Sequence, residues 1–255
     1  MAMLKRLIFS GVRGRLNEVN RWRLDLLKAT YAQTKTVGPY ARLCNLCGYE
    51  GYFQPFGWPI RPEARCPQCE SLERHRLFRL WTDKEKGRFD QKRVLHFAPE
   101  PSLVMFIRPG AAEYLTADIE PGKADRVLNI EQLDLADNSF DLIICSHVLE
   151  HVDDRVALRE LFRVLAPGGL VVLMTPVIEG WTTTYENPDV RTDDERILHF
   201  LQSDHVRLYG ADVRDRIRTA GFALSEFVAV EPFVHRHALV RGGRLFFAAK
   251  PVLGE

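Results

Sequence analysis

Four of the five cysteines form two closely spaced pairs, Cys44-x-x-Cys47 and Cys66-x-x-Cys69, with 18 residues between the pairs. Each pair predicts a tight turn that directs two sulfurs to one point, and two such pairs form a complete tetrahedral ligand set of the kind that binds structural zinc. Gly48 supplies the permissive backbone that such a turn favours. We therefore predict a zinc-ribbon-like module with no open coordination position. An iron site of the same ligand set and a group of buried free thiols are the alternatives.

A second group of candidate residues lies between residues 178 and 207, where polar and charged side chains are dense. His205 is the candidate catalytic base, because a histidine that is neutral near physiological pH can remove a proton from a hydroxyl or an amine. The arginine of this group has the two-pronged geometry that binds a carboxylate or phosphate. A histidine that only packs and an aspartate that only caps a helix are the alternative interpretations. The residues predicted to contact a substrate are Tyr185, Glu186, Asp204 and Arg207.

These residues require a scaffold, and residues 93–250 alternate short apolar runs with helical patterns, as is typical of a parallel α/β sheet. The expected strands are 93–97, 113–117, 126–129, 140–145, 170–175, 223–230 and 244–249, and the expected helices are 101–107, 154–165 and 211–220. The last two strands have no expected helix between them, which predicts an antiparallel hairpin at the sheet edge. Open α/β sheets bind ligands at the carboxyl ends of their strands, so residues 145–151 and 175–176 are expected to face one crevice.

The most specific block runs from Asn138 to Pro176 and contains Ser139-Phe140-Asp141, then Val148-Leu149-Glu150-His151, then Arg163-Val164-Leu165-Ala166-Pro167-Gly168-Gly169. This block resembles the class I, Rossmann-like S-adenosylmethionine-dependent methyltransferases of the type 11 kind. The resemblance covers residues 93–250 and is specific over 113–176. It implies a seven-stranded, mostly parallel sheet with flanking helices, and S-adenosylmethionine as the methyl donor.

The resemblance also implies where the cofactor binds. In that family an acid after the second strand accepts hydrogen bonds from both ribose hydroxyls, and an Asp or Asn with its following residue grips the adenine. The residues at these positions and at the end of the fourth strand are Asp118, Ile119, Asn129, Ile130 and Cys145.

The first cofactor loop departs from the family pattern. Where the family has a glycine-rich loop, this chain reads His96-Phe97-Ala98-Pro99-Glu100-Pro101-Ser102. Glycine there lets the backbone approach the methionine part of the cofactor. We expect Ala98 to be tolerated and Glu100 to meet the cofactor's amino group in place of the acid missing at His96. A pocket altered to bind another ligand is the alternative.

His147-x-x-Glu150-His151 matches the inverted zinc-protease motif. That motif needs both histidines on one helix, whereas here it directly follows a strand inside the methyltransferase-like block. We therefore expect no protease. His151 is a second candidate catalytic residue at the crevice, with a structural role as the alternative.

Charge is distributed unevenly along the 255 residues, whose net charge is +1. Residues 1–93 hold 19 Lys and Arg against 9 Asp and Glu. Such an excess is compatible with contacts to phosphates, an acidic partner or a membrane surface, and equally with arginines that face solvent or the acidic remainder. No apolar run reaches the roughly 18–20 residues of a membrane span, and the amino-terminal residues lack the features of a secretory signal. A cytoplasmic location is therefore expected.

Three regions follow from these patterns: a helical segment at 1–40, the zinc-ribbon-like module with a linking helix capped by Ser71 at 41–92, and a class I methyltransferase domain at 93–255 with a lid insertion at 178–207. The predicted function is methyl transfer from S-adenosylmethionine to a hydroxyl, amine or carboxylate of a small molecule. An RNA methyltransferase that binds nucleic acid through the ribbon, and a cofactor-binding scaffold without turnover, are the alternatives. The acceptor atom and the oligomeric state do not follow from the sequence.

Overall fold

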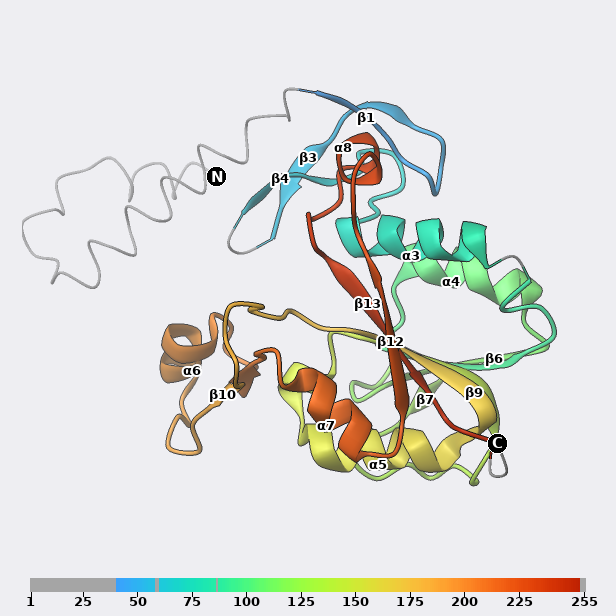
Figure 1. Cartoon of the computed structure of the whole chain (residues 1–255), viewed down its shortest axis with the longest axis vertical. Helices are drawn as coiled ribbons and strands as arrows, with labels where there is room; N and C mark the ends of the chain where they lie inside the picture. The colour runs from blue at the N-terminus through green and yellow to red at the C-terminus, as the bar shows by residue number, and fades with distance from the viewer. Residues whose placement is uncertain (1–39, 58–59, 86, 253–255) are drawn as a thin grey trace, which may run out of the picture.

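The computed structural model describes residues 40–57, 60–85 and 87–252 (Figure 1). The predicted helical segment at 1–40 lies outside the described residues except for Tyr40. No helix within the described ranges is long and apolar enough to cross a bilayer.

A seven-stranded sheet with the order β12-β13-β9-β8-β5-β6-β7 forms the centre of the fold. Its strands are β5 (Arg93–Phe97), β6 (Glu113–Asp118), β7 (Arg126–Val127), β8 (Phe140–Ser146), β9 (Leu165–Met174), β12 (Ala223–Val228) and β13 (Arg244–Ala249). The strands from β9 to β7 are parallel to one another, whereas β13 runs antiparallel to both of its neighbours. This arrangement confirms the predicted Rossmann-like fold class.

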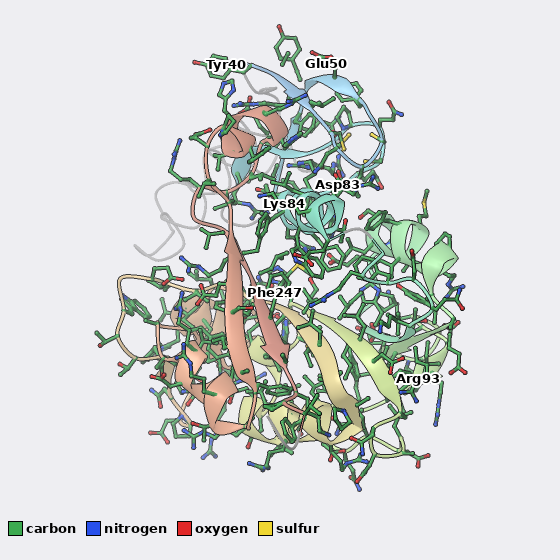
Figure 2. All side chains as sticks on the ribbon, turned by 45° about the vertical axis from the view of Figure 1, so that its right-hand side comes forward. Tyr40, Glu50, Asp83, Lys84, Arg93 and Phe247 are labelled. Atoms are coloured by element: carbon green, nitrogen blue, oxygen red, sulfur yellow. The ribbon has the colours of Figure 1, made fainter. Side chains whose placement is uncertain are left out.

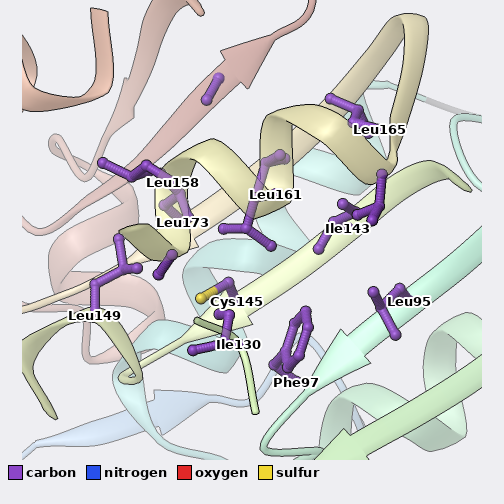
Figure 3. Packing of buried hydrophobic residues seen from close by; sticks show 14 of the residues in the cluster. Leu95, Phe97, Ile130, Ile143, Cys145, Leu149, Leu158, Leu161, Leu165 and Leu173 are labelled. Carbon is purple, nitrogen blue, oxygen red and sulfur yellow. The ribbon is translucent and has the colours of Figure 1, made fainter. Parts of the chain in front are cut away.

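Helices cover both faces of the sheet because its central strands are apolar on both sides (Figure 1). On β8, Ile143 packs on the side of α5 (Asp154–Val164) and α7 (Val213–Thr219), as Figure 3 shows for α5. Its neighbours Leu142 and Ile144 pack on the side of α3 (Glu73–Lys84) and α4 (Pro101–Ile107). Short 3-10 turns, η2 (Arg108–Gly110) and η3 (Leu149–His151), follow α4 and β8.

Two small antiparallel hairpins precede α3: β1 (Ala41–Leu43) pairs with β2 (Glu50–Tyr52), and β3 (Gln54–Phe56) pairs with β4 (Arg61–Arg65). The lid segment, residues 178–207, contains β10 (Tyr185–Glu186) and α6 (Asp193–Phe200), and β10 pairs with β11 (Arg207–Leu208). The lid segment therefore contains regular secondary structure.

The connection between the last two strands differs from the prediction. A short helix, α8 (Phe233–His237), lies between β12 and β13, where no helix was expected. It packs against the first hairpin: His237 Nδ1 donates to the carbonyl of Leu43 at 2.8 Å, and Arg42 donates to the carbonyl of His235. These partners lie more than 190 residues away in the chain, so no local pattern could reveal the helix.

Candidate functional site: a cysteine cluster and the carboxyl edge of the sheet

The four paired cysteines meet at one point in the module formed by the two hairpins. Sγ of Cys44 lies 3.6 Å from that of Cys69, Sγ of Cys47 lies 3.7 Å from that of Cys66, and all four sulfurs lie within 4.8 Å of one another. A tetrahedron with zinc–sulfur bonds of about 2.3 Å has sulfur–sulfur edges of roughly 3.8 Å. The cluster therefore has the size of a four-thiolate zinc site.

The two cysteine turns are built alike. The amide of Cys44 donates to Tyr49 O, and that of Gly48 donates back to Cys44 O, both at 2.8 Å. In the second turn the amide of Cys66 donates to Ser71 O, and that of Glu70 donates to Cys66 O, both at 3.0 Å. Gly48 and Glu70 occupy the same left-handed position, with φ of 79° and 57°. The permissive backbone predicted for Gly48 is thus required in both turns.

Ser71 does not cap the linking helix as predicted. Leu72 is the N-cap of α3, and the Ser71 hydroxyl instead lies 3.3 Å from the sulfurs of both Cys44 and Cys69. Burial opposes ionisation of Cys44, but the hydrogen bonds from Ser71 and the turn amides lower the pKa of this thiol to about 7. A thiolate is the form that binds a metal.

Arg76 joins the module to the rest of the chain. Its fully buried guanidinium donates to four backbone carbonyls, those of Ala64, Ser71, His237 and Ala238, at 2.6–2.9 Å. The side chains of Trp81 on α3 and Phe247 on β13 add an aromatic contact, with 4.6 Å between the ring centroids. Phe247 is labelled in Figure 2. Polar contacts of Arg76 therefore hold the module, α3 and α8 together, and an aromatic contact joins α3 to the sheet.

The first cofactor loop keeps a glycine-like backbone without glycine. Ala98 has φ of 47°, and its amide donates to Ala117 O at 2.9 Å. Glycine adopts this left-handed conformation readily, whereas an alanine adopts it at a cost of about 1–2 kcal/mol.

Glu100 is held by residues of the linking helix. Its Oε1 accepts from Arg74 Nε at 2.8 Å and lies 2.8 Å from His75 Nε2, and its Oε2 accepts from the Ser146 hydroxyl at 3.0 Å. Burial alone would raise the pKa of Glu100, but His75 and Arg74 outweigh it and hold the pKa well below its usual range. The predicted contact with the cofactor's amino group therefore concerns a carboxylate that already has three partners.

Arg74 and His75 were missed by the sequence interpretation. The amide of Leu72 and the hydroxyl of Ser102 both donate to His75 Nδ1, at 3.0 and 2.8 Å, which leaves Nε2 as the protonated nitrogen. The available signal was an arginine in the first turn of a helix, where an acid is usual. That arginine is explained by the carboxylate of Glu100 and not by the helix itself.

His96 lies inside the fold. It is fully buried, its Nδ1 lies 2.6 Å from the Tyr114 hydroxyl, and burial lowers its pKa to about 4. Its Nε2 has no hydrogen-bond partner among the described residues. The residue that replaces the family's acid is thus a neutral imidazole on the α3 and α4 side of the sheet.

The remaining predicted cofactor residues divide into exposed and buried ones. Asp118 ends β6, and its Oδ1 accepts from the amide of Glu120 at 2.9 Å; Ile119 beside it is 63% exposed. Asn129 is exposed, but Ile130 belongs to the core and is only 4% exposed. Cys145 also points into the core, as Figure 3 shows, where burial raises the pKa of its thiol. Ile119 therefore offers an adenine ring more apolar surface than Ile130.

Glu150 and two histidines form a compact group at the carboxyl ends of β8 and β9. Glu150, His151 and His205 each bring one ligand-type atom within 4.8 Å of the others. The buried carboxylate of Glu150 accepts from His147 Nδ1 at 3.0 Å and from the Thr175 hydroxyl at 2.9 Å. Burial would raise the pKa of Glu150, but the His147 contact lowers it overall. The sequence analysis assigned Glu150 no site role, although the residue belongs to the methyltransferase-like block and to the rejected protease motif.

The two histidines predicted to be catalytic face each other. Their ring centroids are 4.7 Å apart, and their planes are inclined by 82°. His151 Nδ1 lies 3.2 Å from the carbonyl and 3.3 Å from Oδ2 of Asp204, so Nδ1 is the donor and Nε2 is free to accept. His205 is 5% exposed, its Nδ1 has no hydrogen-bond partner among the described residues, and burial lowers its pKa. The His205 ring is therefore suited to be a neutral base or a ligand.

Arg207 is engaged within its own chain, in contrast to its predicted contact with a substrate anion. It is buried and donates to Glu186 Oε1 at 2.6 Å and to the carbonyls of Leu149, at 2.6 Å, and Val152. Glu186 also accepts from Arg216, at 3.0 Å. Arg207 and Glu186 thus fix the lid segment to the loop after β8, through Nε and Nη1 of the arginine.

Tyr185 has a partner inside the lid segment. Its hydroxyl lies 2.6 Å from His199 Nδ1, and the two rings are stacked with centroids 6.0 Å apart. Asp204 is the most exposed of the four predicted substrate residues, and its contact to His151 connects the lid segment to the histidine pair.

Solved structures with the same fold include an S-adenosylmethionine-dependent methyltransferase from Mesorhizobium loti, with 16% identity and a TM-score of 0.50 over 68% of this chain and 96% of the other. The cyclase SpnF also matches, with 16% identity and a TM-score of 0.52 over 70% of this chain and 82% of the other. These similarities place the described sheet in the class I methyltransferase fold.

The sequence comparisons give a similarity to methyltransferases over part of the chain. Residues 107–173 match the family described as Methyltransferase domain. A protein from Mycolicibacterium smegmatis, named as a probable S-adenosylmethionine-dependent methyltransferase, is 28% identical over 54% of this chain and 47% of its own length. A demethylmenaquinone methyltransferase from Corynebacterium glutamicum is 32% identical over 52% of this chain and 66% of its own length. The chain thus spans about half to two thirds of these curated relatives.

Proposed function

We propose that this protein transfers a methyl group from S-adenosylmethionine to a small-molecule acceptor. The observation that carries the proposal is the gathering of Asp118, Glu100, Glu150 and the histidine pair at the carboxyl ends of β5, β6, β8 and β9, within a domain of the methyltransferase family. Ligands of open α/β sheets bind at that edge. The cofactor would supply an electrophilic methyl group bound to a sulfonium sulfur.

The cofactor would lie along the first three of these strands. Asp118 would accept hydrogen bonds from the ribose hydroxyls, and the exposed Ile119 side chain would pack on the adenine, beside Asn129. Ala98 keeps the loop backbone close to the sheet because its amide bonds to Ala117 O. Glu100 would attract the amino group of the methionine part, because its carboxylate is held in the ionised state.

The acceptor would lie between this edge and the lid segment, next to His151 and His205. A neutral imidazole with a free nitrogen can activate a hydroxyl or amine by taking its proton. The neutral state is favoured because His205 is buried. A demethylmenaquinone methyltransferase among the relatives supports a small molecule as the acceptor.

The cysteine cluster fits a structural zinc ion. Cys44, Cys47, Cys66 and Cys69 would supply all four ligands, so no position would be left for a substrate. Its proposed role is to hold the hairpins and the start of α3, from which Arg74 and His75 reach Glu100.

A transfer assay with methyl-labelled S-adenosylmethionine tests the proposal. The full chain is incubated with separate small-molecule, RNA and protein fractions of a cell extract. Label should enter the small-molecule fraction and should decrease by about 100-fold or more with His205→Ala, the loss typical of a removed acid–base group. Label confined to RNA would contradict the proposed acceptor class, and cofactor binding without any transfer would contradict catalysis.

A further inference from the structure

We propose that Glu150, His151 and His205 form a binding site for a divalent transition-metal cation, distinct from the four-cysteine cluster. Two imidazoles and one carboxylate are a common ligand set for zinc and for iron(II) sites that keep open positions for a substrate. The three residues come from η3 and from the lid segment, and their ligand-type atoms lie within 4.8 Å of one another.

The contacts around His151 match those of a metal-bound histidine. Metal-binding histidines typically donate their second ring nitrogen to a carboxylate or a backbone carbonyl, which fixes the tautomer and the ring orientation. His151 Nδ1 meets both kinds of acceptor on Asp204, the carbonyl at 3.2 Å and Oδ2 at 3.3 Å. Its Nε2 is therefore left with a lone pair for a cation.

His205 provides an independent observation. His205 is only 5% exposed, yet its Nδ1 has no hydrogen-bond partner in the part of the chain that the structure describes. A buried polar atom without a partner costs about 1–3 kcal/mol, so such atoms call for a specific explanation. A cation shared with His151 and Glu150 would give this nitrogen the partner that it lacks.

The carboxylate is held in place as a ligand should be. His147 donates to Glu150 Oε1 at 3.0 Å and Thr175 donates to Oε2 at 2.9 Å, so both oxygens are fixed and each keeps a second lone pair. Glu150 thus offers an oxygen ligand and the two histidines offer nitrogen ligands, a set that suits a divalent transition-metal cation.

The site would have room for a substrate atom. Three protein ligands leave at least one position of a tetrahedral or octahedral cation open. The side chain of His151 is 27% exposed, so the group is not sealed from the crevice. An oxygen of the acceptor could then bind the cation directly. This last step depends on the proposed methyl transfer, whereas the cation site itself does not.

Titration of the purified, zinc-loaded chain with Co²⁺ in the absence of S-adenosylmethionine tests the site. We expect one saturable equivalent by calorimetry, with the weak visible bands of nitrogen and oxygen ligands and without the intense thiolate-to-cobalt band of a cysteine site. His151→Ala should weaken Co²⁺ binding by roughly 10–100-fold or more, and His151→Ala combined with His205→Ala should abolish it. His199→Ala, which removes another histidine of the lid segment, is the matched control and should bind like the wild type.

Thermal unfolding of each variant shows whether it is folded. Glu150→Gln removes the carboxylate while keeping the size of the side chain. Absence of saturable Co²⁺ binding by the wild type would overturn the proposal. Unchanged binding by the folded double variant, or a thiolate band on titration, would do the same. Co²⁺ binding without methyl transfer would instead count against the proposed function alone.

Discussion

His75 Nε2 lies 2.8 Å from Glu100 Oε1, so a helix that starts next to the cysteine cluster directly contacts the first cofactor loop. Ser71 extends this connection, because its hydroxyl meets two of the cysteine sulfurs while its carbonyl accepts from Arg76. The small module and the seven-stranded sheet are therefore joined at Glu100.

The Glu100 contact predicts a particular dependence of stability on pH. Burial raises the pKa of this carboxyl, but His75 and Arg74 lower it by more than burial raises it. The pKa in the folded state is therefore depressed. Its stabilising contribution is present above the unfolded value of about 4.3 and is lost as the pH falls below it. Wild type should lose more stability than Glu100→Gln between pH 5 and 3, as measured by chemical unfolding. Parallel pH profiles of the two proteins would contradict this assignment.

Arg76 should be among the most costly side chains to remove. Arg76→Ala leaves four buried carbonyls without their donor, and we expect a loss of about 3–5 kcal/mol in the free energy of unfolding. Arg79→Ala is the control on the same helix, because Arg79 pairs with the exposed Asp83, and it should change stability by about 0.5 kcal/mol. Similar unfolding midpoints for the two variants would show that the carbonyl contacts do not hold the module.

Removal of a metal from the cysteine cluster should affect the cofactor site as well as the module. Chelation under reducing conditions should release one zinc per chain, lower the melting temperature and weaken binding of S-adenosylhomocysteine, because Ser71 and His75 connect the cluster to Glu100. Cys69→Ser should have the same effects. Release of zinc with unchanged cofactor affinity would contradict this connection, and absence of any bound metal would contradict the zinc assignment.

Ala98 predicts opposite effects for two substitutions at one position. Ala98→Gly relieves the cost of a positive φ, so it should leave stability unchanged or raise it by up to about 1 kcal/mol. Ala98→Val places a β-branched residue in that conformation and should lower stability by more than 1 kcal/mol. Thermal unfolding of both variants measures the difference. A stable Ala98→Val with an unstable Ala98→Gly would contradict the backbone assignment.

The sequence supported the fold more fully than the site. The alternation of apolar runs predicted all seven strands of the sheet, because periodicity and turn residues are local properties. Two features were not predicted: the helix α8 between the last strands and the role of Ser71. Both depend on partners that are distant in the sequence, since α8 contacts Arg42 and Ser71 contacts the sulfur of Cys44. The partner of Arg207 was equally hidden: the same fork that can bind a ligand anion binds the lid segment's own Glu186. The residue type thus indicated that Arg207 can bind an anion, and only the tertiary contacts showed that the anion is Glu186.

The central claim is that S-adenosylmethionine binds at the carboxyl edge of this sheet, and calorimetric titration of the full chain with S-adenosylhomocysteine tests it most directly. Wild type should bind one equivalent. Asp118→Ala should bind at least tenfold more weakly because two ribose contacts, each about 1.5–3 kcal/mol, are lost. Asp215→Ala, at an exposed aspartate of α7, should bind like the wild type. No binding by the wild type, or equal affinities for all three proteins, would contradict the claim.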